Sequence, residues 1–310
     1  MTLAVAGAPV SFGVFELTPD GAATLSADDM LRTLAENGYT GVDLGPTGFL
    51  GDASSVPQKL REYGLELAGG WVDLPLTDDD AFAAALPRLH SALETFSAVA
   101  ETSPSLLPLP TLADSGSPER VLAPGRGSDV QPTTQEQRDR LARNLDAAVS
   151  LVRSAGLEPT FHHHAGTFVE SPAEVDLLLD RVDIGLTLDT GHLAVAGGDL
   201  ATAVERWGAR VNHLHLKDVN TELLNRLLRS GAGMLDVWSS GAFVALGEGD
   251  LAIPQVLDSL LARGYAGWIV VEQDILPGPD VDLADFFRDR VADHQTSRQA
   301  LNAWVPTAAH

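Results

Sequence analysis

Short apolar runs alternate with longer stretches of helical periodicity along almost the whole chain. The apolar runs predicted to be strands are Leu3–Ala8, Gly41–Leu44, Leu65–Val72, Leu106–Leu109, Glu158–Phe161, Ile184–Leu188, Val211–Leu216 and Trp268–Val271. The predicted helices between them are Ala27–Glu36, Ala81–Ala100, Glu136–Ala155, Pro172–Asp180, Ala201–Trp207 and Pro254–Arg263. Strands that alternate with helices indicate a parallel sheet, and eight strands are the number that closes a (β/α)8 barrel. We therefore predict a single-domain α/β protein, a TIM barrel over residues 1–310.

An open, doubly wound sheet is the alternative for the same alternation. No Gly-x-Gly-x-x-Gly follows an early strand and no phosphate-binding loop is present, so the barrel is favoured. Two segments interrupt the alternation. Residues 114–134, rich in Gly, Pro and Ser, are predicted to be a long loop, and residues 220–249 a longer loop with a helical piece at Thr221–Ser230. A last helix is predicted over Leu283–Trp304, closing the barrel or contacting another subunit.

The composition excludes several classes of protein. The chain has 20 Lys and Arg against 43 Asp and Glu, a net charge of −23, which argues against binding to nucleic acid or to anionic membranes. There is no cysteine, so disulfides, thiolate nucleophiles and Cys-type metal sites are excluded. Any metal ion must be held by His, Asp or Glu.

The chain also lacks segments that would direct it to a membrane. No apolar run approaches the roughly 20 residues of a membrane-spanning helix. The N-terminal sequence has neither a basic start nor an apolar stretch of signal-peptide length. We therefore expect a cytoplasmic protein that acts on a small molecule.

Four predicted strands end in polar residues that can bind a metal ion. These endings are Thr160–His164, Leu186–His192, His213–Asp218 and Ile269–Asp274. In a (β/α)8 enzyme the active site lies at the carboxyl ends of the strands, so the four endings should converge. Because side chains alternate between the two faces of a strand, the residues predicted to point inward are Thr160, His162, His164, Thr187, Asp189, His213, His215 and Glu272, with His163 outward.

Each ending has an ordinary structural explanation. A single buried His is more often a hydrogen-bonded core residue than a ligand, and a strand-end Asp often caps the next helix. Four such endings on four consecutive strands are harder to explain in this way. One Asp, one Glu and several His at one mouth are typical of a site for a divalent ion such as Mn²⁺, Co²⁺ or Zn²⁺.

Five further residues near the same rim are weaker candidates. Asp43 could cap a helix or contact a ligand, and Trp71 could stack on a substrate ring or pack in the core. Lys217 could neutralise a substrate oxygen or pair with a carboxylate. Glu248, in a glycine-flanked turn, could reach the site from the second long loop, whereas Glu16 is expected to be a solvated residue.

Longer motifs make the chain similar to a known superfamily. They are Gly38–Gly45, Phe161–Thr167, Leu188–Asp199, His213–Val219, Leu246–Asp250 and Gly264–Glu272. The chain resembles the xylose isomerase-like barrel superfamily, which includes sugar epimerases, isomerases and AP endonucleases. Within it, the motifs are most similar to those of the inosose dehydratases, which act on 2-keto-myo-inositol.

The resemblance implies a metal ion held by Asp189, His215 and Glu272, with a fourth ligand from the fifth strand. Most of the superfamily has a glutamate at that fourth position, and this chain has His162. The difference favours dehydration over the 1,1-proton transfer of the epimerases. Two other positions also differ: Asp43 stands where the family usually has Glu, and Phe12 where it usually has Trp.

The expected activity is that of a hydro-lyase that dehydrates a keto-cyclitol through an enediolate. Mn²⁺ or Co²⁺ is the expected cofactor, with Zn²⁺ or Mg²⁺ as alternatives, acting as a Lewis acid. The expected base is His164 or His192, because histidine takes up protons near neutral pH. The other His, Lys217 or Glu248 would be the acid.

A second set of residues is expected to contact the substrate: Asp43, Trp71, His213 and Glu248. A metal-dependent sugar or cyclitol isomerase or epimerase is the main alternative, and a lyase acting on a 3-keto sugar or glycoside is related to it. The charge argues against an AP endonuclease, and intact ligand positions argue against a catalytically silent sugar-binding protein. A homo-oligomer is an expectation from the superfamily.

Overall fold

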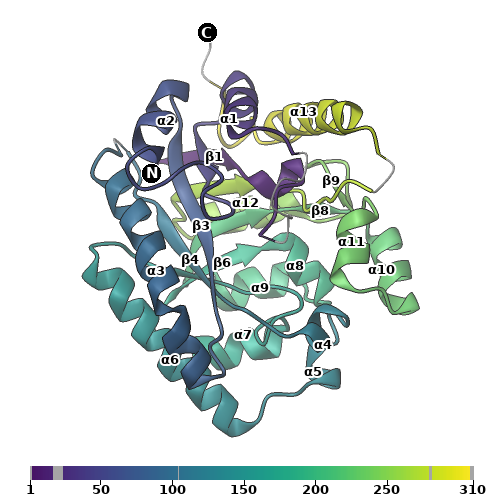
Figure 1. Cartoon of the computed structure of the whole chain (residues 1–310). Helices are drawn as coiled ribbons and strands as arrows, with labels where there is room; N and C mark the ends of the chain where they lie inside the picture. The colour runs from purple at the N-terminus through teal and green to yellow at the C-terminus, as the bar shows by residue number, and fades with distance from the viewer. Residues whose placement is uncertain (1, 17–23, 104, 279–280, 308–310) are drawn as a thin grey trace.

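Eight parallel strands form a closed barrel with the larger helices around it (Figure 1). The computed structural model describes residues 2–16, 24–103, 105–278 and 281–307. In sequence order the barrel strands are β1 (Leu3–Gly7), β2 (Gly41–Asp43), β3 (Glu66–Leu74), β4 (Leu109–Asp114), β5 (Thr160–His162), β6 (Gly185–Asp189), β7 (Val211–Leu216) and β10 (Gly267–Val271). Each strand pairs in parallel with its sequence neighbours, and β10 closes the barrel by pairing with β1 over all five residues of each strand.

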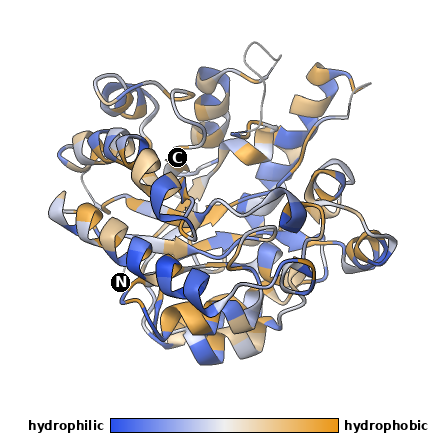
Figure 2. Cartoon of the chain, turned by 60° about the horizontal axis from the view of Figure 1, so that its bottom comes forward, coloured by the Kyte–Doolittle hydropathy of each residue, from blue (hydrophilic) through white to orange (hydrophobic). Residues whose placement is uncertain are grey.

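The helices that link consecutive barrel strands, or follow the last of them, are α1 (Ala27–Glu36), α2 (Val56–Tyr63), α3 (Asp79–Ala100), α6 (Gln135–Ser154), α7 (Pro172–Leu179), α9 (Leu200–Trp207), α12 (Ile253–Ala262) and α13 (Leu283–Ala300). Hydrophilic and hydrophobic residues alternate along them (Figure 2), as expected of helices with one face on the barrel. Capping residues in the sequence determine where some of these helices begin. Thr134 and Gln137 form a capping box at α6, and Ser171 and Glu174 form one at α7.

Short elements occupy the loops that leave the carboxyl ends of the strands. They are η1 (Pro9–Phe12), α4 (Pro118–Val121), α5 (Gly127–Val130), α8 (Thr190–Val195), α10 (Thr221–Ser230), α11 (Met234–Ser239) and a small antiparallel pair of β8 (Asp218–Val219) and β9 (Phe243–Val244). Within the described ranges, every helix is too short or too polar to cross a membrane.

The inside of the barrel is filled differently along its axis. Trp268 packs with small residues, including Ala4, Ala6 and Ala68, near the first residues of their strands. The contact is so close that a Cβ at Gly41 would lie 2.5 Å from Cζ3 of Trp268, so only glycine fits there. This apolar group fills the amino end of the barrel, and the polar residues at the carboxyl ends of the strands lie at the opposite mouth.

The structure confirms the predicted TIM barrel, including the helix at Thr221–Ser230. The fourth strand was predicted wrongly at Leu106–Leu109, since β4 covers Leu109–Asp114. Pro110 sits inside this strand, and a proline ordinarily argues against a strand interior because it lacks an N–H. The predicted loop at 114–134 contains α4 and α5, and the last helix ends at Ala300 rather than Trp304. Helix α13 packs on the barrel through His294, which stacks on Phe12 with ring centroids 4.6 Å apart.

Asp218 ties the second long loop to the barrel. Its carboxylate accepts hydrogen bonds from the backbone N–H groups of Val219, Gly247, Gly249 and Leu251, at 2.9 to 3.2 Å. The side chain is 1% exposed. The Leu246–Asp250 motif is therefore a backbone cradle around a buried carboxylate, and this contact fixes the turn after β9.

We expect Asp218→Ala to lower the free energy of unfolding by roughly 2–4 kcal/mol, because buried backbone donors lose their acceptor. Urea denaturation followed by circular dichroism measures this change. Asp146→Ala, at an exposed position on α6, is the matched control and should change stability by less than about 0.5 kcal/mol. Equal stability of the two variants would contradict the anchoring role of Asp218.

Candidate functional site

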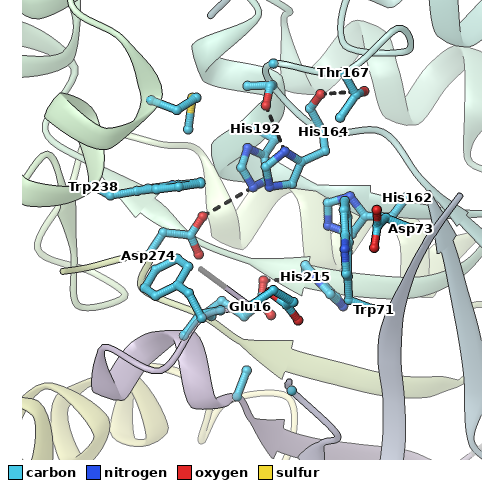
Figure 3. A pocket seen from close by; sticks show the side chains of 18 of the residues that line it. Glu16, Trp71, Asp73, His162, His164, Thr167, His192, His215, Trp238 and Asp274 are labelled. Carbon is cyan, nitrogen blue, oxygen red and sulfur yellow. Dashed lines mark hydrogen bonds and ion pairs between the residues drawn. The ribbon is translucent and has the colours of Figure 1, made fainter. Parts of the chain in front are cut away.

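A cavity of about 360 Å³ opens at the carboxyl ends of the barrel strands (Figure 3). Its walls include most of the polar strand endings. Among the lining residues are Glu16, Asp43, Trp71, Asp73, His162, His164, His192, His215, Lys217, Trp238, Glu272 and Asp274. The convergence expected from the four strand endings is therefore present in the structure.

Four side chains at neighbouring strand ends present donor atoms to one another. His162 ends β5, Asp189 ends β6, His215 lies in β7 and Glu272 follows β10. Oδ2 of Asp189 lies 3.3 Å from Nε2 of His162 and 3.8 Å from Nδ1 of His215. Nδ1 of His215 lies 2.9 Å from Oε2 of Glu272. All four side chains are buried, and one donor atom from each lies within 4.8 Å of those of the others.

These separations fit a single divalent ion. Metal–ligand bonds of about 2.1 Å in a tetrahedral arrangement separate the ligand atoms by about 3.4 Å. The three measured separations, from 2.9 to 3.8 Å, bracket that value. Two imidazoles and two carboxylates are also a donor set that suits zinc, manganese or cobalt.

Lys217 forms a buried ion-pair cluster beside the same carboxylates. Its Nζ lies 2.5 Å from Oδ2 of Asp189, contacts Oε2 of Glu272, and lies 3.4 Å from Oδ1 of Asp274. Burial alone would lower the pKa of Lys217, but the three carboxylates raise it well above its usual value. The side chain is therefore a fixed positive charge, and of its two expected roles the structure shows pairing with carboxylates.

Two histidines lie side by side next to this cluster. The ring centroids of His164 and His192 are 3.6 Å apart, and Nε2 of His192 lies 3.2 Å from Oδ2 of Asp274. Burial lowers the pKa of both rings well below the usual value, and the neighbouring positive groups, including Lys217, act in the same direction. Both imidazoles are therefore neutral near pH 7.

The two nitrogens of His164 have different surroundings. Nδ1 lies 2.8 Å from the carbonyl oxygen of Ala165, which can only accept a hydrogen bond. Nδ1 must therefore carry the hydrogen, and Nε2 keeps a lone pair. Because His164 is only half-buried and lines the cavity, this lone pair is available to a bound molecule.

Two of the expected substrate contacts lie in the cavity wall. Asp43 is 4% exposed and accepts a hydrogen bond from the N–H of Leu44 at 2.6 Å. Burial, opposed in part by His215, raises its pKa to about 6. Trp71 is half-buried, with its ring edge-on to His162 and His164 at centroid distances of 5.3 and 5.0 Å.

Two other expected contacts do not reach the cavity. Glu248 is exposed and is not part of the wall, because the turn that carries it is held by Asp218 through its backbone. His213 points inward as predicted but is fully buried and also absent from the wall. Its Nε2 lies 3.1 Å from where a Cβ of Gly69 would be, so a side chain there would crowd the ring. The assignment of either residue to substrate binding is therefore not supported by its position.

His163 has a structural role, and its side chain points away from the cavity, as predicted. Its Nε2 accepts a hydrogen bond from the N–H of Asp189 at 3.3 Å, and its ring lies 6.2 Å from that of Trp207 on α9. Phe12 likewise packs against His294 and not in the cavity.

Three wall residues were missed or undervalued by the sequence analysis. Asp274 belongs to a strand ending that was identified, but its contacts with His192 and Lys217 could not be inferred from alternation alone. Glu16 was expected to be solvated; more than a third of its surface is accessible, yet it faces the cavity. Surrounding protein and the nearby carboxylates, Asp73 first among them, raise its pKa to about 7. Trp238 comes from the second long loop, where no periodic pattern marks it.

The fold and the site define a class of protein: a (β/α)8 barrel with a cluster of histidines and carboxylates at the carboxyl mouth. Comparison of the sequence with protein families narrows this class. Residues 31–290 match the family described as xylose isomerase-like TIM barrel, and the chain belongs to that family.

Two relatives cover most of the chain. The rhizopine catabolism protein MocC of Rhizobium meliloti is 31% identical over 262 residues, which are 80% of this chain and 74% of that protein. An inosose dehydratase of Geobacillus kaustophilus is 27% identical over 292 residues, covering 88% and 89% of the two chains. The resemblance to inosose dehydratases indicated by the motifs is thereby confirmed.

Solved structures share the fold at low sequence identity. The IOLI protein, whose crystal structure has a bound zinc atom, matches with a TM-score of 0.70 at 11% identity, over 99% of this chain and all of that one. A probable 3-DHS dehydratase from Bacillus anthracis matches with a TM-score of 0.64 at 13% identity, over 97% and 99% of the two chains. These likenesses support the barrel architecture.

Proposed function

We propose that this chain is a metal-dependent hydro-lyase that removes water from a keto-cyclitol of the 2-keto-myo-inositol type. The observation that carries the proposal is the donor cluster of His162, Asp189, His215 and Glu272 directly beside the neutral imidazole of His164. The relatives named inosose dehydratase support the same reaction. Cytoplasmic location and homo-oligomerisation stay predictions from the sequence.

The charges of the site favour a bound cation. Asp43, Asp189, Glu272 and Asp274 supply four buried carboxylates, and Lys217 supplies one buried ammonium group. Negative charge therefore exceeds positive charge at the mouth of the barrel. When bound by His162, Asp189, His215 and Glu272, such an ion would supply Lewis-acid polarisation of the substrate carbonyl. Mn²⁺ or Co²⁺ is the cofactor that we propose.

The proton to be removed lies on the carbon next to the carbonyl group. His164 is the base that we propose, because its Nδ1–H donates to Ala165, its Nε2 keeps a lone pair, and the side chain lines the cavity. The electron pair of the broken C–H bond forms the enediolate. His192 packs against His164 and contacts Asp274, so it holds the base in position.

The hydroxyl group on the next carbon then leaves with a proton as water. Lys217 is a poor donor for this step because its pKa is raised well above the usual value. Glu16 is the acid that we propose, since it faces the cavity and has a pKa of about 7. Lys217 instead keeps a positive charge near the negative charge that develops on the substrate.

The proposal predicts loss of water from 2-keto-myo-inositol, detected by mass spectrometry with Mn²⁺- or Co²⁺-loaded protein. Protein treated with EDTA should be inactive, and Glu272→Gln should lose both the metal, measured by elemental analysis after dialysis, and the activity. Glu248→Gln, at an exposed position, is the control and should retain both.

Other outcomes separate the alternatives. A product of unchanged mass, with a substrate C–H exchanged for solvent deuterium, would replace the dehydratase by an isomerase or epimerase. Metal binding without turnover of keto-cyclitols would move the search to 3-keto sugars and glycosides. Full metal content in Glu272→Gln would contradict the donor set.

We expect His164→Gln to retain the metal and to lower kcat by about 10²- to 10⁴-fold, the usual contribution of a positioned general base. Steady-state kinetics and elemental analysis of the same sample measure both quantities. His90→Gln, at an exposed position on α3, is the control. Unchanged kcat in His164→Gln would rule out His164 as the base.

The acid role of Glu16 predicts a pH dependence. The carboxyl group must be protonated to donate, so kcat/KM should fall as the pH rises through about 7. Glu16→Gln should be slower and should lack this fall. A wild-type profile in the Gln variant would exclude Glu16 as the acid.

A further inference from the structure

One wall of the cavity is apolar and lies outside the barrel. It is formed by Val10 in η1, Phe15 after it, Val121 in α4, and Met234 and Trp238 in α11. These residues belong to, or pack against, a second hydrophobic cluster that is separate from the main core. Trp238 lies on one side of the cavity and Trp71 with His162 on the other (Figure 3), so a bound molecule would meet an apolar wall opposite a polar one.

Trp238 is held firmly in this wall. Its carbonyl oxygen accepts a hydrogen bond from the N–H of Leu276 at 3.0 Å, which ties α11 to the segment that follows Asp274. Its indole ring packs against the ring of Phe15 at a centroid distance of 5.1 Å. The side chain is 8% exposed and still lines the cavity.

The indole N–H of Trp238 has no hydrogen-bond acceptor among the described residues. A buried indole N–H normally has an acceptor, because an unpaired buried donor costs free energy. Trp304 shows the usual arrangement, since its Nε1 donates to Asp258 at 2.7 Å. The Nε1 atoms of Trp238 and of Trp268, in the barrel interior, are both buried and unpaired, so the indole ring of Trp238, and not its N–H, is the part that lines the cavity.

We propose that Trp238 is a specificity-determining residue that contacts the substrate and selects a rigid polyol ring over an open-chain polyol. This inference rests on the proposed function and names the shape of the substrate. The indole ring packs against the C–H groups of the substrate ring. The ring of His164 lies 6.4 Å from that of Trp238, so a substrate seated on the indole is close to the proposed base.

A ring suits this wall for two physical reasons. A cyclitol presents C–H groups on its faces and hydroxyl groups at its edge, which matches an apolar wall facing a cluster of carboxylates and histidines. An open-chain polyol must instead freeze several rotatable bonds when it binds, and this ordering weakens its affinity.

The test compares the binding of two unreactive polyols, each with six carbons and six hydroxyl groups. Calorimetry with Mn²⁺-loaded protein should give a Kd for myo-inositol at least about 10-fold lower than for D-glucitol. Trp238→Leu should reduce this preference to less than about 3-fold. Trp238→Phe, which keeps an aromatic ring in the apolar wall, should retain the preference for myo-inositol.

Trp304→Leu is the matched control, because it removes an indole that lies outside the cavity. It should leave both Kd values unchanged. Equal Kd values for the two polyols in the wild type, or a wild-type preference in Trp238→Leu, would overturn the proposal. Because neither polyol is turned over, this result is independent of whether the chain dehydrates a keto-cyclitol.

Discussion

The site is organised by the need to keep several charges buried at the mouth of a barrel. A carboxylate removed from water is costly unless an opposite charge lies close to it. The ammonium group of Lys217 meets that need for Asp189, Glu272 and Asp274 at once. Its contacts fix where the three carboxylates stand, and these in turn position His215 and His192. The parallel barrel makes the arrangement feasible, because it brings the ends of β6, β7 and β10 to one rim.

Much of the architecture could be predicted from the sequence. The alternation of apolar runs and amphipathic stretches predicted eight strands in the right order. The alternation of side chains between the two faces of each strand then identified Asp189, His215 and Glu272 as pointing into the barrel. The position of the fourth strand was predicted wrongly because Pro110 argues against a strand at that point. In the structure, pairing with β3 stabilises β4 despite this unfavourable local preference. Residues whose role depends on tertiary contacts were harder to assign. A backbone cradle keeps Glu248 outside the site, whereas burial, with smaller contributions from nearby carboxylates, raises the pKa of Glu16, and neither effect can be read from the local sequence.

The polar wall and the apolar wall of the cavity have different roles. The polar wall consists mainly of residues at or just after the strand ends, whose positions are set by the hydrogen bonds of the barrel and by the buried ion pairs. The apolar wall comes from η1, α4 and α11, which are short elements attached to the barrel at a few points, such as Asp218 and the bond from Leu276 to Trp238. Metal ligands require positions fixed to within a fraction of an ångström, and the strand ends supply them. Recognition of substrate shape depends on the packing of side chains.

The attachment of the second long loop through the carboxylate of Asp218 has an evolutionary consequence. The partners of Asp218 are backbone N–H groups of Val219, Gly247, Gly249 and Leu251, which lie outside α10 and α11. Exposed and cavity-lining side chains of α10 and α11 can therefore diverge while the loop keeps its anchor on the barrel. A gene duplicate of this chain could acquire a new substrate by changing residues between 221 and 240, with the ion-pair cluster and the metal-ligand positions inherited intact.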